Sequence, residues 1–295
     1  MVIQSDTRRM QVYGALLLLP AAVLLATFAY LPTVATVINS LFLPGFGGAP
    51  AQFVGLENYA LLFEDATFWK VARNNLIYAL GTIPTSMALA LGMALFVNGR
   101  LPGRSFVRMA YFTPTVLPMI AAANIWMFFY APQIGLFNTL LGAFGIPGVN
   151  WLGDPGVALY SVIAMAVWKE AGFFMIFYLA ALQSIPPELK EASDLEGTSR
   201  WSFFRRVTFP LLMPTTLFVL INALINAVRV IDHLFILTKG GPNNATNLLL
   251  YYVYENAFSF FDRTYAATIT VVILVVLAAV ATIKFAVLDR RTHYQ

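Results

Sequence analysis

Long stretches without a charged residue divide this chain. Residues 10–56, 74–99, 109–153 and 207–228 contain no Asp, Glu, Lys or Arg. A helix that crosses the hydrocarbon core of a bilayer needs about 20 consecutive, mostly apolar residues, because a helix satisfies its own backbone polar groups. Each charge-free stretch is long enough for one such helix. The sequence therefore predicts a protein built inside a membrane.

The composition agrees with this prediction. Hydrophobic residues make up 59% of the 295 residues and charged residues 11%, whereas a soluble domain has about 25% charged residues. We expect an all-α integral membrane protein that forms a single domain over residues 1–295. Its six transmembrane helices are expected at about 13–41, 75–97, 107–130, 157–183, 211–236 and 265–287.

The first apolar stretch follows Arg8 and Arg9, an arrangement that also occurs in secretory signal peptides. The apolar core of a signal peptide has only about 7–15 residues, and the uncharged stretch here continues to Leu56. We therefore interpret it as a retained first helix.

Basic residues concentrate on one side of the predicted six-helix topology. Short loops rich in Lys and Arg stay on the cytoplasmic side. With the N-terminus inside, that side receives Arg8, Arg9, Arg100, Arg104, Arg108, Lys190, Arg200, Arg205, Arg206, Lys284, Arg290 and Arg291, and the other side Lys70, Arg73, Lys239 and Arg263. This predicts an N-in, C-in protein of a bacterial inner membrane. The net charge of +4 then reflects topology and contact with membrane lipid, and gives no support for nucleic-acid binding.

Several kinds of chemistry lack the residues that they need. The chain has no cysteine, and its two histidines, His233 and His293, lie on different segments. A metal centre or a hydrolase triad is therefore poorly supported. The sequence also lacks the Gly-x4-Gly-Lys-Ser/Thr pattern of a phosphate-binding loop, so another polypeptide would have to hydrolyse ATP. We expect no catalytic residue, metal or cofactor in this chain.

The connection at 184–214 is the one large polar segment expected on the cytoplasmic side. Pro186 and Pro187 suit the first turn of a helix, and Glu191 lies in the part of that helix where the dipole favours acidic side chains. Gly197 follows where a helix needs a residue that tolerates a left-handed conformation. These residues predict a short helix with a sharp end.

A second helix is expected directly after the first. Thr198 or Ser199 can cap its N-terminus, and Trp201, Phe204 and Val207 recur on one side. Taken alone, the connection also fits a solvated loop with an amphipathic helix lying on lipid.

The full pattern is more specific. Glu191-Ala192-Ser193, then Gly197, then 207–210 (Val-Thr-Phe-Pro) resemble the EAA loop in permeases of binding-protein-dependent ABC importers. The resemblance implies a coupling helix that fits a groove on the ATPase subunit. Carried over to this chain, it makes Glu191, Ala192 and Gly197 the core contacts and Leu195 an apolar plug.

The resemblance extends over nearly the whole chain. Residues 53–59, 167–169, 181–186 and 240–242 look like the carbohydrate branch of these permeases, which handles maltose, oligosaccharides and glycerol 3-phosphate. It implies a permease subunit that imports a sugar, a polyol or an anionic derivative such as a glycerol phosphate. It also implies a second permease, two ATPase subunits that bind ATP and Mg²⁺, and an extracytoplasmic solute-binding protein.

Four charged residues fall inside the predicted spans away from the cytoplasmic ends of those spans. Such a charge costs about 2.5–3.5 kcal/mol on insertion scales, so it needs a partner or a water-filled cavity. Lys169 and Glu170 lie near the middle of the fourth span, and Arg229 and Asp232 lie toward the outer end of the fifth, three residues apart on one helix face. For Arg229 and Asp232, either an internal ion pair or contact with a solute would offset the cost of placing a charge in the membrane. Because the Trp-Lys pair looks general in the family, Lys169 is interpreted as more structural than solute-reading.

Asn222 and Asn226 complete the candidate substrate path. Their amides are expected to bond solute hydroxyls, although hydrogen bonds between helices are an equally ordinary role. We expect the path between the fourth and fifth helices and their counterparts in the partner permease. The aromatic residues Phe173, Phe174 and Phe177 are instead interpreted as packing or lipid-facing surface.

Two other functions compete with this interpretation. An ion-coupled secondary transporter would also place charges in its spans, but it needs no docking loop. A membrane enzyme acting on lipid would need clustered catalytic groups, which the sequence lacks. Within the importer hypothesis, a neutral sugar suits the Asn and Asp residues, and a phosphorylated or sulfonated solute suits Arg229 and Lys169.

Overall fold

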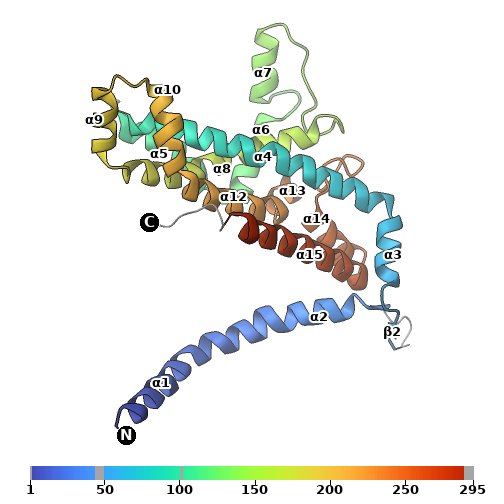
Figure 1. The fold of residues 1–295 in the computed structure, drawn as a ribbon. Helices are drawn as coiled ribbons and strands as arrows, with labels where there is room; N and C mark the ends of the chain where they lie inside the picture. The colour runs from blue at the N-terminus through green and yellow to red at the C-terminus, as the bar shows by residue number, and fades with distance from the viewer. Residues whose placement is uncertain (1, 44–49, 100–101, 289–295) are drawn as a thin grey trace. The chain divides into compact units, whose positions relative to one another are not determined.

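The structure of the chain is a computed structural model that describes residues 2–43, 50–99 and 102–288 (Figure 1). It is mainly helical, which confirms the all-α class. The chain divides into two compact units, Met1–Asp65 with Val253–Ala278, and Ala66–Tyr252 with Ala279–Gln295. Arg100, Arg290 and Arg291, on which the orientation prediction partly depends, lie outside the described residues.

The first unit combines the beginning of the chain with a segment near its end. Its elements are α1 (Val2–Leu25), the π-helical η1 (Ala26–Tyr30), α2 (Leu31–Asn39), β1 (Phe42–Leu43), β2 (Gln52–Phe53), α3 (Glu57–Glu64), η3 (Glu255–Ser259) and most of α15 (Arg263–Leu288). The two strands pair antiparallel. No loop interrupts the run from α1 to α2, which agrees with the first expected span.

Hydrogen bonds close the turns of this unit. The Asn58 amide donates to the carbonyls of Ser40, at 2.8 Å, and Phe42, at 2.9 Å, which fixes the end of α2 to α3. The Tyr265 hydroxyl donates to Asp65 Oδ2 at 2.6 Å and links the start of α15 to the residue after α3.

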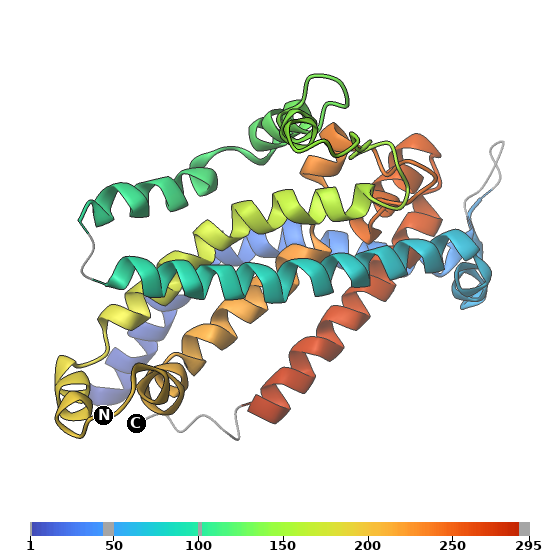
Figure 2. The same ribbon diagram turned by 90° about the horizontal axis from the view of Figure 1, so that it is seen from above.

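The second unit contains most of the helices. They are α4 (Ala66–Asn98), α5 (Arg104–Val116), α6 (Met119–Phe129), α7 (Leu136–Ala143), α8 (Ala158–Gln183), α9 (Pro187–Leu195), α10 (Arg200–Phe203), η2 (Phe204–Thr208), α11 (Phe209–Leu211), α12 (Met213–Val228), α13 (Asp232–Leu237) and α14 (Leu249–Tyr254). Helices α4 and α8 lie side by side (Figure 2), and α5 and α12 pack against them. Small side chains such as Ala90 and Ala166 are fully buried in this core, which lets the helices approach closely.

The third expected span is not one helix, so the prediction of a continuous helix over 107–130 is wrong. Helices α5 and α6 meet at an angle of 103°. Pro118 disfavours a helical conformation in the residue before it, and Leu117 is accordingly extended, with φ −66° and ψ 133°. The chain therefore turns sharply where a straight span was expected.

The fifth expected span, 211–236, is also broken. The helical segments Arg200–Leu211 and Met213–Val228 are bent by 65°, next to Pro214, which has no N–H to donate. Helix α12 then ends at Val228, and α13 begins only at Asp232. No proline or glycine marks this second break, and Val230 packs into the hydrophobic core beside it.

The remaining spans agree better with the expectation. Within the described residues, three helical segments, including α4 and α8, are long and apolar enough to cross a membrane, and five are if each bent pair counts as one span. The sixth expected span corresponds to α15, whose apolar stretch is recorded over Arg263–Ala279.

Candidate solute cavity and docking hairpin

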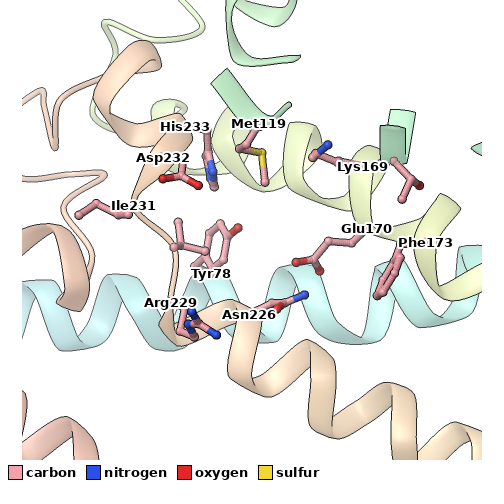
Figure 3. Close-up of a pocket in the computed structure, with 12 residues that line it drawn as sticks. Tyr78, Met119, Lys169, Glu170, Phe173, Asn226, Arg229, Ile231, Asp232 and His233 are labelled. Carbon is pink, nitrogen blue, oxygen red and sulfur yellow. The ribbon is translucent and has the colours of Figure 1, made fainter. Parts of the chain in front are cut away.

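A cavity of about 300 Å³ lies in the second unit, where both helix breaks meet α4 and α8 (Figure 3). Of the six residues expected along the substrate path, five line it, namely Lys169, Glu170, Asn226, Arg229 and Asp232. The break after α5 contributes Thr115 and Met119, and the break after α12 contributes residues 229–233. The kinks that the sequence analysis missed therefore form this cavity.

Lys169 serves as a cap for the broken third span. Its Nζ donates to the carbonyls of Pro114, at 3.0 Å, and Leu117, at 2.5 Å. Carbonyls at a helix C-terminus have no donor within the helix and carry the negative end of its dipole, so a cation stabilises them. In Figure 3 the ammonium group points away from the Glu170 carboxylate. The interpretation of Lys169 as structural fits this geometry.

Gly172 lies one turn further along α8 and allows this approach. A Cβ atom built there would lie 2.2 Å from the Tyr111 carbonyl oxygen of α5, far inside van der Waals contact. The missing side chain lets α8 touch the backbone of α5. Lys169 can therefore reach the end of that helix.

Glu170 faces the cavity from α8. Its carboxylate and the Asn226 amide of α12 face each other in Figure 3. A carboxylate among helices needs such a donor to compensate for its lost hydration. These two side chains come from α8 and α12, the helices that were expected to border the path.

Arg229 and Asp232 do not share a helix face as expected, because α12 ends between them. The ion pair recorded among the described residues is Lys190–Asp194, on α9, and none joins Arg229 to Asp232. The hypothesis of an internal ion pair that locks one helix is therefore wrong. Both side chains are exposed at the cavity instead.

Three polar lining residues were not predicted from the sequence, Tyr78, Thr115 and His233. His233 is 1% exposed, and its Nε2 atom has no hydrogen-bond partner; nor has Thr115 Oγ1. The rings of Tyr78 and His233 are stacked with centroids 6.2 Å apart. The one available signal for His233 was its position next to Asp232, and the prolines at 114 and 118 flanked Thr115. Nothing in the local sequence marks Tyr78.

The sixth candidate and the aromatic stripe lie differently. Asn222 donates to the Phe218 carbonyl of its own helix at 2.8 Å and does not line the cavity. Phe174 is fully buried, and Phe177 packs edge-on against Phe173, as expected for packing residues. Phe173 itself also lines the cavity, which the packing interpretation had not predicted.

We define the docking hairpin as residues 184–214, whose helices α9 and α10 lie at one end of the second unit (Figure 1). Pro187 begins α9, as predicted. At the other end Gly197 has φ +67°, its N–H bonds to the Asp194 carbonyl, and the Thr198 N–H bonds to the Ser193 carbonyl. These two bonds are the Schellman pattern that closes a helix through a left-handed residue. The predicted sharp end is confirmed.

The second helix of the docking hairpin also begins as predicted. Ser199 caps α10, with its hydroxyl oxygen accepting from the Ser202 N–H at 3.3 Å. The rings of Trp201 and Phe204 stack with centroids 5.6 Å apart. Between the two helices the chain therefore reverses direction through defined caps.

The four expected ATPase contacts form an uncovered surface. Glu191, Ala192, Leu195 and Gly197 are all exposed, and Leu195 is 90% exposed. A leucine side chain so open to solvent is costly to leave without a partner, because burying it contributes about 1.5–3 kcal/mol. The four residues lie together on α9 and its C-terminal turn.

These features are a membrane domain of bent helices, a cavity lined by charged residues and a capped hairpin. Residues 83–294 match the model of the family described as "Binding-protein-dependent transport system inner membrane component". The chain belongs to this family. It is a permease of an inner-membrane ABC importer, and separate ATPase subunits hydrolyse the ATP.

Relatives and a solved structure agree with this assignment. The chain is 34% identical over 260 residues to the sulfoquinovosyl glycerol transport system permease protein SmoG of Agrobacterium fabrum, covering 88% of this chain and 84% of the relative. It is 35% identical over 238 residues to the trehalose/maltose transport system permease protein MalF of Thermococcus litoralis, covering 79% of each. A chain of a bacterial alginate ABC transporter in complex with an alginate pentasaccharide-bound periplasmic protein shares the fold, with TM-score 0.86, 22% identity and 100% of both chains covered.

Proposed function

We propose that this chain forms half of the translocation path of an importer for a carbohydrate or carbohydrate derivative, and that the solute contacts the cavity at Glu170, Asn226, Arg229 and Asp232. The observation that supports it best is the cavity itself, with its hydrogen-bonding lining and volume of about 300 Å³. Small-molecule sites in proteins commonly measure about 300–1,000 Å³. The names of the two relatives described above, SmoG and MalF, refer to carbohydrates or a carbohydrate glycoside.

The charges of the lining favour a neutral, polyhydroxylated solute over a glycerol phosphate or other anion. Lys169 and Arg229 are balanced by Glu170 and Asp232, and the Lys169 ammonium is already occupied by two carbonyls. Thr115, Asn226 and His233 add uncharged polar side chains to this lining. Sites built to bond hydroxyls discriminate strongly, because a solute without them leaves buried polar groups unpaired.

We also propose that the docking hairpin couples this path to the ATPase subunit, with Glu191, Ala192, Leu195 and Gly197 in the contact. The exposure of Leu195 beside a rigidly capped helix supports this role. A second permease subunit, two ATPase subunits and an extracytoplasmic solute-binding protein complete the proposed transporter. The basic residues Arg104, Arg108, Arg200, Arg205 and Arg206 support a hairpin on the cytoplasmic side.

The path is tested by transport in proteoliposomes that contain the complete transporter, with Asn226→Ala and Arg229→Ala as variants and Asn222→Ala as the matched control. Loss of the Asn226 amide removes the polar group that faces Glu170 and is expected to change the ratio of uptake rates between a neutral sugar and a sugar phosphate. Asn222→Ala should leave that ratio unchanged. If both cavity variants assemble and keep the wild-type preference, the placement of the path is wrong.

Transport that continues without ATPase subunits and stops when an ion gradient is removed would instead establish the ion-coupled alternative. No finding in the structure or the comparisons favours that carrier. The carrier experiment repeats the uptake measurement in proteoliposomes that lack the ATPase subunits.

A further inference from the structure

Two adjoining cavities follow the contact between α5 and α8, away from the solute cavity. The smaller, of about 110 Å³, is lined by Val97, Arg104, Ser105, Arg108, Leu179 and Gln183. The larger, of about 320 Å³, is lined by Ser105, Arg108, Met109, Phe112, Met175 and Ile176. Because both include Ser105 and Arg108, they form one continuous groove, which we call the α5–α8 groove.

The groove changes from polar to apolar along its length. Its polar end holds two guanidinium groups at the first turns of α5 and an amide at the last residue of α8. Its apolar end, at Phe112 and Met175, lies two turns deeper, about 12 Å along the helix axis. On both helices the polar residues lie at this end and the apolar residues lie further in, because α5 starts where α8 ends.

The two arginines are available to a ligand. Arg104 and Arg108 are four residues apart, so they project from the same face of α5. Both are exposed, no acidic residue lines either cavity, and the described part of the chain records no ion pair for either. Phe106 and Met109, beside them, are 69% and 58% exposed. Two free guanidinium groups therefore adjoin an open apolar surface.

We propose that the α5–α8 groove binds an anionic phospholipid, with its phosphate on Arg104 and Arg108 and an acyl chain along Met109, Phe112, Met175 and Ile176. A phospholipid carries its charge at the membrane boundary and its apolar chains deeper, which is the order of the groove. Guanidinium groups bind phosphate through paired hydrogen bonds. Basic pockets between membrane helices on the cytoplasmic side suit such headgroups, and the basic residues of this chain favour that side for the polar end.

The proposal is tested with the complete transporter, purified in detergent and titrated with phosphatidylglycerol or with phosphatidylcholine of the same acyl chains, with binding measured by native mass spectrometry. The wild-type complex is expected to bind phosphatidylglycerol more tightly. One basic residue near a lipid surface contributes about fivefold in affinity, so the double variant Arg104→Gln with Arg108→Gln should lose about 25-fold. Arg104→Lys with Arg108→Lys keeps the charges and should lose much less.

Matched controls distinguish binding in the α5–α8 groove from general attraction of an anionic lipid to basic residues. Arg205→Gln with Arg206→Gln removes the same charge from exposed residues of the docking hairpin and should leave phosphatidylglycerol binding unchanged. Ile176→Trp fills the apolar cavity and should weaken binding of both lipids. Soluble glycerol phosphate should fail to displace the lipid, because it lacks the acyl chain.

Three results would overturn the proposal. They are equal binding of the two lipids to the wild-type complex, an equal loss in the Arg205 and Arg206 control, and full displacement by glycerol phosphate. The first would indicate that another occupant, such as the partner permease, covers the groove, and the last that the arginines hold a soluble anion. The wild-type comparison decides the matter even if a variant fails to assemble.

Discussion

The docking hairpin and the solute cavity are both made from helix ends, but the ends are closed in different ways. In the docking hairpin, the N–H groups of Gly197 and Thr198 close α9 by bonds to carbonyls three and five residues back. At the cavity, the end of α5 is closed by Lys169, which lies 52 and 55 residues further along the chain. The hairpin can form from its own segment, whereas the cavity exists only once α5 and α8 have packed.

This comparison predicts where substitutions act. Changes in the docking hairpin should alter one helix end and leave the membrane core intact. Changes at the cavity should disturb the packing of several helices at once. The predictions below test that contrast, from the largest expected effect to the smallest.

The largest effect is expected for Lys169→Met. The substitution leaves the carbonyls of Pro114 and Leu117 without a donor, and each unpaired buried group costs about 1–3 kcal/mol. The thermal unfolding midpoint of the purified transporter should fall, in line with a loss of about 2–6 kcal/mol. Lys169→Arg, which keeps a cationic donor, should fall less. An unchanged midpoint for the Met variant would show that the bend after α5 does not depend on Lys169.

Gly197→Val should act on coupling alone. A branched residue forced into the left-handed conformation costs about 1–2 kcal/mol. This corresponds to roughly a tenfold fall in the equilibrium constant for closing the C-terminus of α9. ATP hydrolysis stimulated by the solute-loaded binding protein should drop accordingly, while the unfolding midpoint changes little. Gly197→Asn is the matched control, since asparagine tolerates positive φ and open space surrounds the position within this chain.

Comparison of the Val and Asn variants distinguishes two reasons for a glycine at position 197. One is the left-handed backbone conformation, and the other is close contact with the ATPase subunit. If Gly197→Asn is as damaging as Gly197→Val, the docking surface itself requires a residue without a side chain. That result would overturn the view that the conformation of the helix end explains the glycine. Gly197→Asp is expected to fall between them in the same assay, because it adds a charge to the proposed ATPase contact.

A smaller effect is expected for Ser199→Ala. Loss of a serine N-cap costs about 1 kcal/mol, so α10 should fray while α9 stays closed by Gly197. Hydrogen exchange of the amides in Arg200–Phe203 should become faster. Ser199→Asp keeps a capping oxygen and should preserve the protection. Faster exchange throughout α9 as well would show that the two caps are not independent.

The smallest effect is expected for Asn222→Ala. Its amide bonds only a carbonyl of its own helix in the recorded contacts, so stability should change by less than about 0.5 kcal/mol. Uptake rates should match those of the wild type. A clear change in solute preference would return Asn222 to the substrate path and extend the cavity one turn along α12.

The same contrast explains how much the sequence could predict. The docking hairpin follows from residues that act on their neighbours. Pro187 and Gly197 were assigned correctly, and Ser199 is one of the two residues expected to cap the second helix. The kink after α5 had a local signal in Pro118, which a search for long apolar spans overlooked. The break at 229–231 has no such signal, because Arg229, Val230 and Ile231 are all compatible with a helix.

The cavity needed information that is not local. Charges and amides in the spans identified five of its lining residues, since each of them required a polar environment. Tyr78, Thr115 and His233 join them only through the packing of α4, α5 and α13 around α8. The acceptors of Lys169 could not be predicted either. They are backbone carbonyls at a helix end that was not expected, and the sequence does not identify such groups.

The bond between Lys169 and the end of α5 also bears on how the protein is made. A lysine in the middle of a span opposes release from the translocon into lipid unless a partner is already present. Residues 114 and 117 are synthesised more than 50 residues before Lys169. The kinked α5–α6 pair should therefore stay beside the insertion channel until α8 has been synthesised. In a ribosome-bound chain truncated before Lys169, the end of α5 should lack the hydrogen bonds that Lys169 donates.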